Sequence, residues 1–322
     1  MTRDKLLTYP RRILIVQAGD VGEAVQTLPM LTALRTRFPF VDIAWFCRQE
    51  TAKTLQGHWA VNRFIIAADD WYKSFAGILH IRRQLLNFAP EIALNVQNTY
   101  SSHWVTRLSG ARRRFRHRKE AGDKKSYTFP RSCSHTEANL KLLEVFGVAG
   151  SSIAYDVPIC AMDRRGAVQK LQSAGLDGNY AVLNVGAENG SAYRNGEYFG
   201  LTAKYLLAQW NLPSLVIWNK SGEKELAESA VRTSEGAAVR SPWFMPGELS
   251  AVLHSATLFI SSESPFRYLA EALETPCIDV RGQGKIELTT AMLCGICDDK
   301  LSEIIQPQTV PLHQKELQKK AA

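Results

Sequence analysis

Residues 12–29, which read RILIVQAGDVGEAVQTLP, combine an apolar strand, a turn of small residues and the start of a helix. A short run of β-branched and other apolar residues is typical of a strand buried on both faces of a parallel sheet. Gly19 and Gly22 allow the backbone to turn sharply and to approach a ligand closely, and Asp20 is a candidate N-cap for the helix. Glu23 then lies at the carboxyl end of the strand, where open α/β sheets bind ligands, and is a candidate general base.

The same alternation of strands and helices continues along the chain and begins again in its second half. We predict strands at residues 13–16, 42–46, 64–67, 92–96, 180–185, 214–218, 257–260 and 277–280. Helices are expected from the first turn to about residue 38 and at residues 78–88, 135–147, 196–209, 224–233, 249–255 and 265–273. This alternation favours an α/β fold with parallel sheets. With 322 residues the chain is long enough for two domains, which we predict at residues 1–155 and 156–322 with a linker near residues 150–165.

Composition places the chain among globular proteins, with 45% hydrophobic and 22% charged residues. The sequence contains no run of about 18 apolar residues that would indicate a transmembrane helix, and its first twelve residues lack the apolar core of a signal peptide. These features predict a cytoplasmic protein. Six scattered cysteines do not form a disulfide framework. Cys294 and Cys297 form a single CxxC pair without further zinc ligands nearby, so we expect structural thiols and no metal.

Charge is concentrated in one segment of the chain. The formal net charge is +8, which favours an anionic partner such as nucleic acid, a phosphate-bearing ligand or an acidic membrane surface. Residues 112–119 read RRRFRHRK and form a dense basic block. Two interpretations of this block stay open, namely a solvated loop and an anion-binding segment.

Seven segments, taken in order, carry a resemblance to a known family. They are residues 12–16 with Gly22-Glu23 and Thr27-Leu28-Pro29; residues 92–97; His135 with Leu140, Leu142 and Leu143; residues 182–187; Ser221-Gly222-Glu223; Met245 followed by residues 249–256; and residues 262–276, SESPFRYLAEALETP. Together they resemble the bacterial ADP-heptose:lipopolysaccharide heptosyltransferases, glycosyltransferase family 9. The resemblance implies a GT-B fold, in which two Rossmann-like domains with parallel sheets face a central cleft.

The resemblance also implies a reaction and a set of site residues. The amino-terminal domain would bind the lipopolysaccharide core acceptor and the carboxy-terminal domain ADP-heptose, with inversion at the anomeric carbon and with neither metal nor cofactor. Glu23 takes the position of the catalytic base. Donor-binding positions are Gly186, Ala187, Arg194, Glu223, Met245, Glu263, Ser264, Pro265, Arg267 and Tyr268. Acceptor-binding positions are Gly22, Gln26, Gln97, Arg112, Arg113, Arg114, Arg116, Arg118 and Lys119, and the basic residues would also suit an anionic inner-membrane surface.

Four positions depart from the family pattern: Glu23 replaces Asp, Ala192 replaces Lys, Pro265 replaces Gly and Tyr268 replaces His. A second hypothesis is therefore a degenerate family member that binds a nucleotide-sugar or glycolipid without efficient transfer. Two other classes are disfavoured. Residues 19–22 do not form the G-x-G-x-x-G of dinucleotide enzymes, and the basic block lacks a recognisable nucleic-acid module.

Overall fold

The computed structural model describes residues 9–68, 70–97, 99–117, 134–148, 154–186, 196–218, 221–261, 264–280 and 290–304. The chain divides into two compact units. The first comprises Met1–Ser173, Pro242–Ser255 and Ser264–Thr275, and the second comprises Ala174–Ser241, Ala256–Glu263 and Pro276–Ala322. The predicted domain boundary between residues 155 and 156 stays a prediction.

The first unit contains a parallel sheet of five strands in the order β3-β2-β1-β4-β5. Its strands are β1 (Arg12–Val16), β2 (Asp42–Arg48), β3 (Arg63–Ala67), β4 (Ile92–Asn95) and β5 (Arg113–Arg116). Residues 13–16 of the central strand are completely buried, as the continuous apolar run predicted. The chain adds β2 and β3 on one side of β1, then β4 and β5 on the other, so the direction of winding reverses between β1 and β4.

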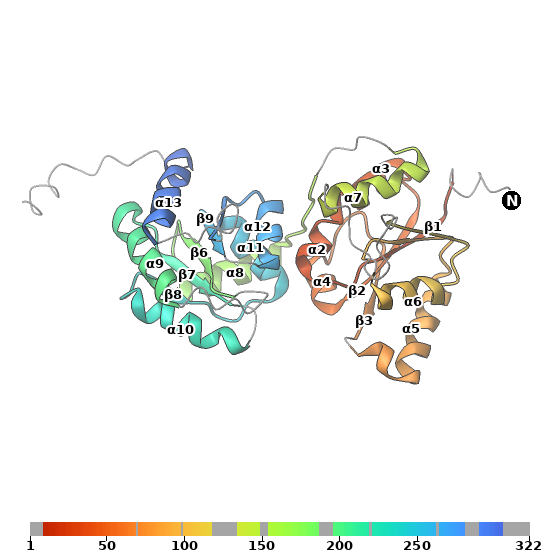
Figure 1. The fold of residues 1–322 in the computed structure, drawn as a ribbon, viewed down its shortest axis with the longest axis horizontal. Helices are drawn as coiled ribbons and strands as arrows, with labels where there is room; N and C mark the ends of the chain where they lie inside the picture. Colours follow the sequence, from red (N-terminus) through yellow and green to blue (C-terminus); the bar gives the residue numbers. More distant parts are fainter. Residues whose placement is uncertain are drawn as a thin grey trace, which may run out of the picture. The chain divides into compact units, whose positions relative to one another are not determined.

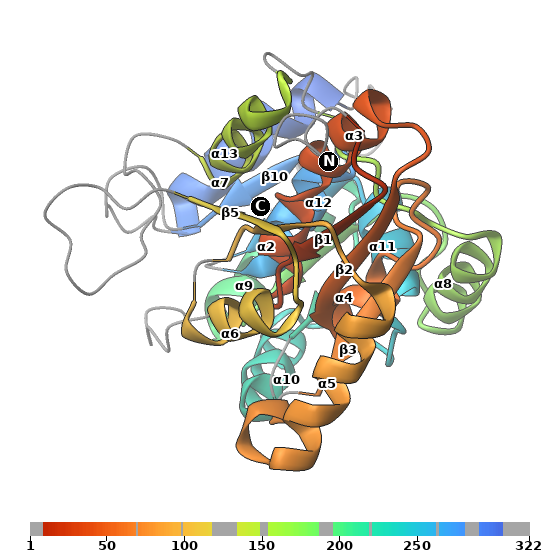
Figure 2. The same cartoon turned by 90° about the vertical axis from the view of Figure 1, so that its right-hand side faces the viewer.

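Helices cover both faces of this sheet. Helices α5 (Phe75–Phe88) and α6 (Tyr100–Leu108) lie side by side and pack their apolar side chains against β1, β2 and β4 in one core (Figure 2). Helices α3 (Leu28–Arg37) and α7 (His135–Lys141) lie on the opposite side (Figure 1). The remaining helices of the unit are α2 (Val21–Val25), α4 (Gln49–Thr54), α8 (Ala161–Ser173), α11 (Pro246–Ser255) and α12 (Pro265–Ala272), with 3-10 turns at Trp71–Lys73 and Leu142–Phe146.

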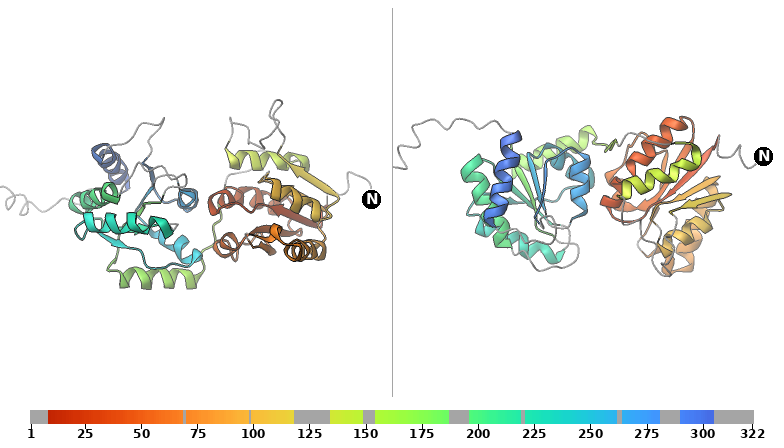
Figure 3. Two further views of the ribbon diagram at one scale, coloured as in Figure 1. Left: turned by 60° about the horizontal axis from the view of Figure 1, so that its bottom comes forward. Right: turned by 45° about the horizontal axis from the view of Figure 1, so that its top comes forward.

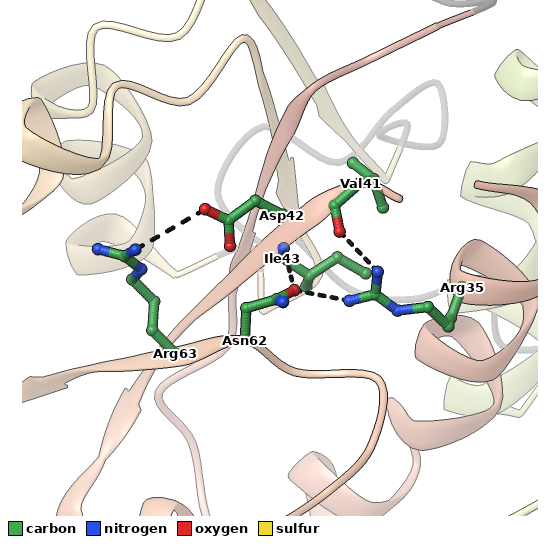
Figure 4. A network of polar contacts seen from close by, with 6 residues as sticks. All are labelled: Arg35, Val41, Asp42, Ile43, Asn62 and Arg63. Atoms are coloured by element: carbon green, nitrogen blue, oxygen red, sulfur yellow. Dashed lines mark hydrogen bonds and ion pairs between the residues drawn. The ribbon is translucent and has the colours of Figure 1, made fainter. Parts of the chain in front are cut away.

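A polar network fixes the amino-terminal ends of β2 and β3 (Figure 4). Arg35 of α3 donates to the carbonyl oxygen of Val41 and to Oδ1 of Asn62, both at 2.6 Å. The same Asn62 oxygen accepts the backbone N–H of Ile43 at 2.8 Å. Because this network lies at the ends of the strands where ligands do not bind, its role is structural.

Three local expectations needed correction. The helix expected to run to about residue 38 is interrupted at Gln26 and Thr27. A new helix begins at Leu28, because Pro29 in its first turn cannot donate a backbone hydrogen bond to the previous turn. The centre of the basic block, Arg113–Arg116, is the edge strand β5 and not a loop. Residues 161–165, at the end of the segment predicted as a linker, form the start of α8, which begins at Ala161.

The second unit contains another parallel sheet with the same pattern of winding, in the order β10-β9-β6-β7-β8. Its strands are β6 (Ala181–Asn184), β7 (Ser214–Ile217), β8 (Ala238–Arg240), β9 (Leu258–Ser261) and β10 (Cys277–Asp279). Helices α9 (Gly196–Trp210), α10 (Lys224–Thr233) and α13 (Thr290–Ile304) pack on this sheet in one apolar core, with α9 beside both of the others (Figure 3). The winding reverses between β6 and β9.

None of the helices in the described ranges is both long and apolar enough to cross a bilayer. The expectation of a cytoplasmic location stays a prediction. Cys47, Cys160, Cys277, Cys294 and Cys297 are all free thiols, and burial raises the pKa of Cys47 and of Cys297 to about 12. Such thiols are poor nucleophiles, which agrees with a structural role.

Candidate active site

In the first unit, the point where the winding reverses brings together the loops that follow β1 and β4. After β1 the chain continues to one side of the sheet, and after β4 it continues to the other side. A crevice forms between the two diverging connections at the carboxyl ends of the strands, and α/β proteins bind ligands there. The backbone N–H of Ala18, after β1, donates to Oε1 of Gln97, after β4, at 3.1 Å. Gln97 in turn donates its own backbone N–H to Oδ1 of Asn95 at 3.2 Å. Gln97, a predicted acceptor-binding residue, therefore ties the two loops together.

Glu23 lies in the first turn of α2 at this edge. Asp20 is the N-cap predicted from the sequence, and its carboxylate accepts the backbone N–H of Glu23 at 2.8 Å. The Glu23 carboxylate accepts a hydrogen bond from Nε2 of Gln17 at 2.8 Å. Gln17 is only 2% exposed, and its Oε1 accepts the backbone N–H of Gly19 at 3.1 Å. This second bond fixes which end of the Gln17 amide faces Glu23.

Gly19 provides the space that the Glu23 side chain occupies. A Cβ atom at Gly19 would lie 1.7 Å from Oε2 of Glu23. The glycine is therefore required by the close approach of a carboxylate to the backbone. The carboxylate is half-buried, which suits a group that has to remain within reach of a substrate.

The other predicted residues of α2 lie deeper in the unit. Gly22 is buried where α2 packs against α12, and both helices belong to the first unit. A Cβ atom there would come within 2.9 Å of the carbonyl oxygen of Pro265 and 2.8 Å of the Tyr268 ring. Gln26 is 8% exposed, and its amide donates to the carbonyl oxygen of Gly22 at 3.4 Å.

His135, the first residue of α7, belongs to the same surroundings. Burial lowers the pKa of His135, and the nearby carboxylate of Asp20 opposes that shift. His135 therefore lies near Asp20, the N-cap of α2, although the sequence connects it to the site only through the family resemblance. Its distance of more than a hundred positions from Asp20 in the sequence explains why spacing alone could not join them.

The basic block is divided between the two faces of β5. Side chains alternate along a strand, so Arg114 and Arg116 are exposed while Arg113 and Phe115 are half-buried. Phe115 packs edge-on against Phe146, with 6.1 Å between ring centroids. Arg112 is exposed before the strand begins, and Arg118 and Lys119 lie outside the described residues.

Sequence reasoning missed a group of residues on α6 that faces Arg114 and Arg116. His103, Thr106 and Arg107 line a depression of about 500 Å³ together with those two arginines. Their spacing of three and four places all three on one face of a helix. That signal was present in the sequence, but α6 was not among the predicted helices.

In the second unit, two predicted donor-binding residues meet at the carboxyl end of β6. Gly186 follows β6 and is buried, and Glu223, at 9% exposure, closes the 3-10 turn Ser221–Glu223 after β7. A Cβ atom at Gly186 would lie 2.3 Å from Oε2 of Glu223. A glutamate carboxylate thus packs on a glycine that follows the central strand, as Glu23 packs on Gly19 in the first unit.

Buried polar atoms lie at the same end of this sheet. Asn184 ends β6, and Ser261, its neighbour in register, ends β9. Both residues are completely buried, and neither Nδ2 of Asn184 nor Oγ of Ser261 has a hydrogen-bond partner within the described ranges. Buried polar atoms of this kind are normally satisfied by a ligand or a water molecule, so this end of the sheet is a candidate ligand site.

The remaining predicted donor-binding residues occupy α12 and the approach to α11. Ser264 caps α12, with its hydroxyl oxygen accepting the backbone N–H of Phe266 at 3.2 Å, and Pro265 occupies the first turn. Arg267 forms an ion pair of 2.7 Å with Glu271, one turn along the helix. Tyr268 and Met245 are 42% and 45% exposed. Ala187, Arg194 and Glu263 lie outside the described residues.

No group of three His, Cys, Asp or Glu side chains that could hold a metal ion occurs within the described part of the chain. Metal independence stays a prediction. Two parallel α/β sheets wound in the same order, each with polar side chains at the carboxyl end of its central strand, place the chain in the GT-B class of fold expected from the sequence.

A family model described as glycosyltransferase family 9 (heptosyltransferase) matches residues 78–294. The chain belongs to this family, which confirms the class of enzyme indicated by the sequence. A curated relative, lipopolysaccharide heptosyltransferase 1 of Pseudomonas aeruginosa, is 26% identical over 106 residues, which cover 31% of this chain and 30% of the relative.

Two solved structures share the fold. The family 9 glycosyltransferase of Veillonella parvula superposes with a TM-score of 0.73 at 16% identity, covering 94% of this chain and 92% of that protein. The E. coli heptosyltransferase WaaC with ADP superposes with a TM-score of 0.68 at 20% identity, covering 92% and 99%. WaaC is also known with ADP-2-deoxy-2-fluoro heptose.

Proposed function

We propose that this protein transfers heptose from ADP-heptose to the inner core of lipopolysaccharide, with inversion at the anomeric carbon and without a metal ion. Membership of family 9 and the two ligands of WaaC support a nucleotide-sugar donor. The curated match to a lipopolysaccharide heptosyltransferase supports the acceptor class. The observation that carries the proposal is the position of the Glu23 carboxylate, held by Gln17 at the carboxyl end of β1.

Glu23 acts as the general base in this proposal. Its carboxylate removes the proton from an acceptor hydroxyl as that oxygen attacks the anomeric carbon of the donor. The bond between the anomeric carbon and the diphosphate oxygen breaks in the same displacement, and ADP leaves with the bonding electrons. A single displacement from the face opposite the leaving group inverts the configuration. A carboxylate fixed by a buried amide suits this role, because a misplacement of about 1 Å can cost roughly 100-fold in rate.

The donor residues are proposed to act at the carboxyl end of the second sheet and at the start of α12. Glu223 and Gly186 would contact the nucleoside, and the unpartnered polar atoms of Asn184 and Ser261 support a polar ligand there. Ser264, Pro265, Arg267 and Tyr268 would lie along the diphosphate. Met245 would contact the adenine, while Ala187, Arg194 and Glu263 complete the predicted donor set.

The acceptor is proposed to bind at the carboxyl end of the first sheet. Gly22, Gln26 and Gln97 would form the floor, and Arg112–Arg116 together with Arg118 and Lys119 would attract the anionic groups of the core. The same cations would hold the protein on an anionic inner-membrane surface from the cytoplasmic side, since each cation near such a surface contributes about 1 kcal/mol.

Calorimetric titration with ADP and ADP-heptose, followed by a transfer assay on a truncated core acceptor, tests the proposal. Glu23→Gln keeps the size of the side chain and removes its basicity. We expect this variant to bind the donor like the wild type and to transfer at least about 100-fold more slowly. Equal transfer rates would remove Glu23 from the mechanism.

A degenerate relative that binds these ligands without transfer is the second candidate, supported by the proline at the start of α12, where one backbone N–H is missing from the diphosphate side. Wild-type binding of ADP-heptose without turnover would favour this candidate. An absence of binding by either nucleotide would contradict transfer from ADP-heptose and would favour a degenerate relative that binds a glycolipid.

A further inference from the structure

A positively charged depression lies over β4, α6 and β5 of the first unit. Its volume is about 500 Å³, which falls in the range of small-molecule sites. Six of the residues that line it are Asn95, His103, Thr106, Arg107, Arg114 and Arg116. All of them belong to the first unit, so the depression is complete within one folded body.

The cations of this pocket come from two elements, helix α6 and strand β5, and the residue spacing within each element places them on one face. Arg107 lies one turn after His103 on α6. Arg114 and Arg116 lie two residues apart and share one face of β5. Three guanidinium groups therefore meet over a small area without a carboxylate among the lining residues. Neither Arg107 nor Arg114 forms an ion pair with any acidic residue in the described ranges.

Like charges gathered in this way repel one another, and the repulsion is relieved when an anion binds among them. Arg107, Arg114 and Arg116 are all exposed, so the pocket is open to an incoming ligand. An arrangement of this kind is unfavourable for the empty protein and favourable for a complex with a multiply charged anion.

His103 fixes the orientation of one of the three guanidinium groups. Nη1 of Arg116 lies 2.7 Å from Nε2 of His103. A guanidinium can only donate hydrogen bonds, so Nε2 accepts and the imidazole is neutral. Burial and the charge of Arg116 both lower the pKa of His103, in agreement with the neutral form.

We propose that this pocket binds a phosphate monoester carried by the sugar acceptor. This inference rests on the proposed function and deepens it, because it names the chemical group by which the acceptor is selected. A phosphate monoester carries close to two negative charges and three acceptor oxygens, which match several guanidinium donors. Arg forms bidentate contacts with such a group. The volume beyond the phosphate leaves room for the sugar ring that bears it.

Inorganic phosphate is the probe for the site itself. The double variant Arg107→Gln/Arg114→Gln removes two charges from exposed positions that make no ion pair in the described ranges, so its thermal unfolding is expected to match the wild type. Titration calorimetry is expected to show phosphate binding weakened at least about 10-fold, with ADP binding unchanged. Arg83→Gln on the exposed face of α5 is the matched control and is expected to bind phosphate like the wild type. Equal phosphate binding by the wild type and the double variant would overturn the proposal.

Transfer kinetics show whether the phosphate belongs to the acceptor. The double variant is expected to raise the KM for a phosphorylated truncated core at least about 10-fold, with kcat within about twofold. The KM for the same core after enzymatic removal of its phosphate groups is expected to be the same in the variant and the wild type. An equal rise in KM for both acceptors would overturn the proposal, because general charge and not a phosphate would then be recognised.

Vesicles distinguish an acceptor phosphate from a lipid headgroup. If the double variant loses binding to phosphatidic acid vesicles but keeps the wild-type KM for the phosphorylated core, the pocket is a membrane contact and the proposal is wrong. If phosphate binding falls in the variant while no form of the protein transfers sugar, the phosphate site stands and the proposed transfer reaction fails.

Discussion

The side-chain amide of Gln17 donates a hydrogen bond of 2.8 Å to the carboxylate of Glu23. Gln17 is buried at the end of β1, and the indole of Trp45 donates to its backbone carbonyl at 3.1 Å. The position of the candidate base is therefore set by the central strand as well as by its own helix. A base held from two elements loses little conformational entropy when a substrate binds, which is what a general base requires.

Replacing Gln17 tests this arrangement. Gln17→Leu keeps a similar volume but removes the donor to Glu23 and the acceptor for the Gly19 N–H. We expect kcat for sugar transfer to fall about 10-fold or more, since a hydrogen bond to a charged group contributes about 1.5–3 kcal/mol. KM for both substrates should change less than twofold. Steady-state kinetics measure both constants, and Gln84→Leu on α5 is the control for the loss of a glutamine. A rise in KM with an unchanged kcat would argue against a positioning role.

Gly19→Ala is expected to displace the Glu23 carboxylate, because the new methyl group would take the space that the carboxylate occupies. The new methyl group would lie 1.7 Å from Oε2 of Glu23, and the atom in the way belongs to the end of a flexible side chain. The protein should therefore fold, with Glu23 moved out of place. We expect transfer to fall to within about 10-fold of the rate of Glu23→Gln, because an unpositioned base contributes little.

Gly295→Ala on α13 is the control for Gly19→Ala, because a Cβ atom there would meet nothing within 4 Å. This control should leave transfer unchanged. Wild-type transfer by Gly19→Ala, with a normal melting temperature, would show that the observed position of Glu23 is not the active one.

Gly186→Ala is the corresponding test in the second unit. A Cβ atom at Gly186 would lie 2.3 Å from Oε2 of Glu223 and would move that carboxylate away from the end of β6. If Glu223 contacts the nucleoside, ADP should bind at least about 10-fold more weakly, as for the loss of a hydrogen bond to a charged group. Titration calorimetry measures the change, with Glu223→Gln for comparison. Unchanged ADP affinity in both variants would remove this pair from the donor site.

Stability should depend on pH through His117. Burial lowers the pKa of His117 to about 4; the hydrogen bond with Asn139 opposes this shift and the neighbouring His135 adds to it. In the unfolded chain the pKa is near 6.5. The unfolded state thus takes up the proton first as the pH falls, so stability is full above pH 6.5 and is lost progressively towards pH 4. A shift from 6.5 to about 4 corresponds to on the order of 3 kcal/mol.

Urea unfolding at pH 7.5, 6 and 5 measures this dependence. His117→Gln can still donate to Oδ1 of Asn139 but cannot take up a proton, so its unfolding free energy should fall less steeply with decreasing pH than that of the wild type. His80→Gln, at an exposed position of α5, should follow the wild type. Parallel curves for all three proteins would show that His117 does not titrate on unfolding in this range. His58, whose pKa burial also lowers to about 4, should account for part of the remaining slope.

The inner strands of both sheets could be predicted because buried parallel strands are short apolar runs, as in residues 13–16 and 181–184. The edge strands Arg113–Arg116 and Ala238–Arg240 were missed, since each is only partly buried and neither is a continuous apolar run. Helix α6 was missed because Thr99 and Ser102, which form its capping box, were not recognised as a helix start. Pro29 marks the break between α2 and α3 in the sequence. The helical pattern on both sides of Pro29 nevertheless favoured one continuous helix.

The sequence by itself determined the repeated alternation of strands and helices, the family and the position of Glu23 after the first strand, because these depend on local patterns of apolar residues, glycines and caps. Only the tertiary structure decided which residues surround that carboxylate and which cations gather into a pocket. Gln17 acts on Glu23 through a side-chain hydrogen bond and Gly19 through the space that it leaves, while Arg107 and Arg114 line one pocket from two different elements. Such contacts depend on strand register and helix rotation, which are set by packing between distant segments and cannot be inferred from local sequence patterns.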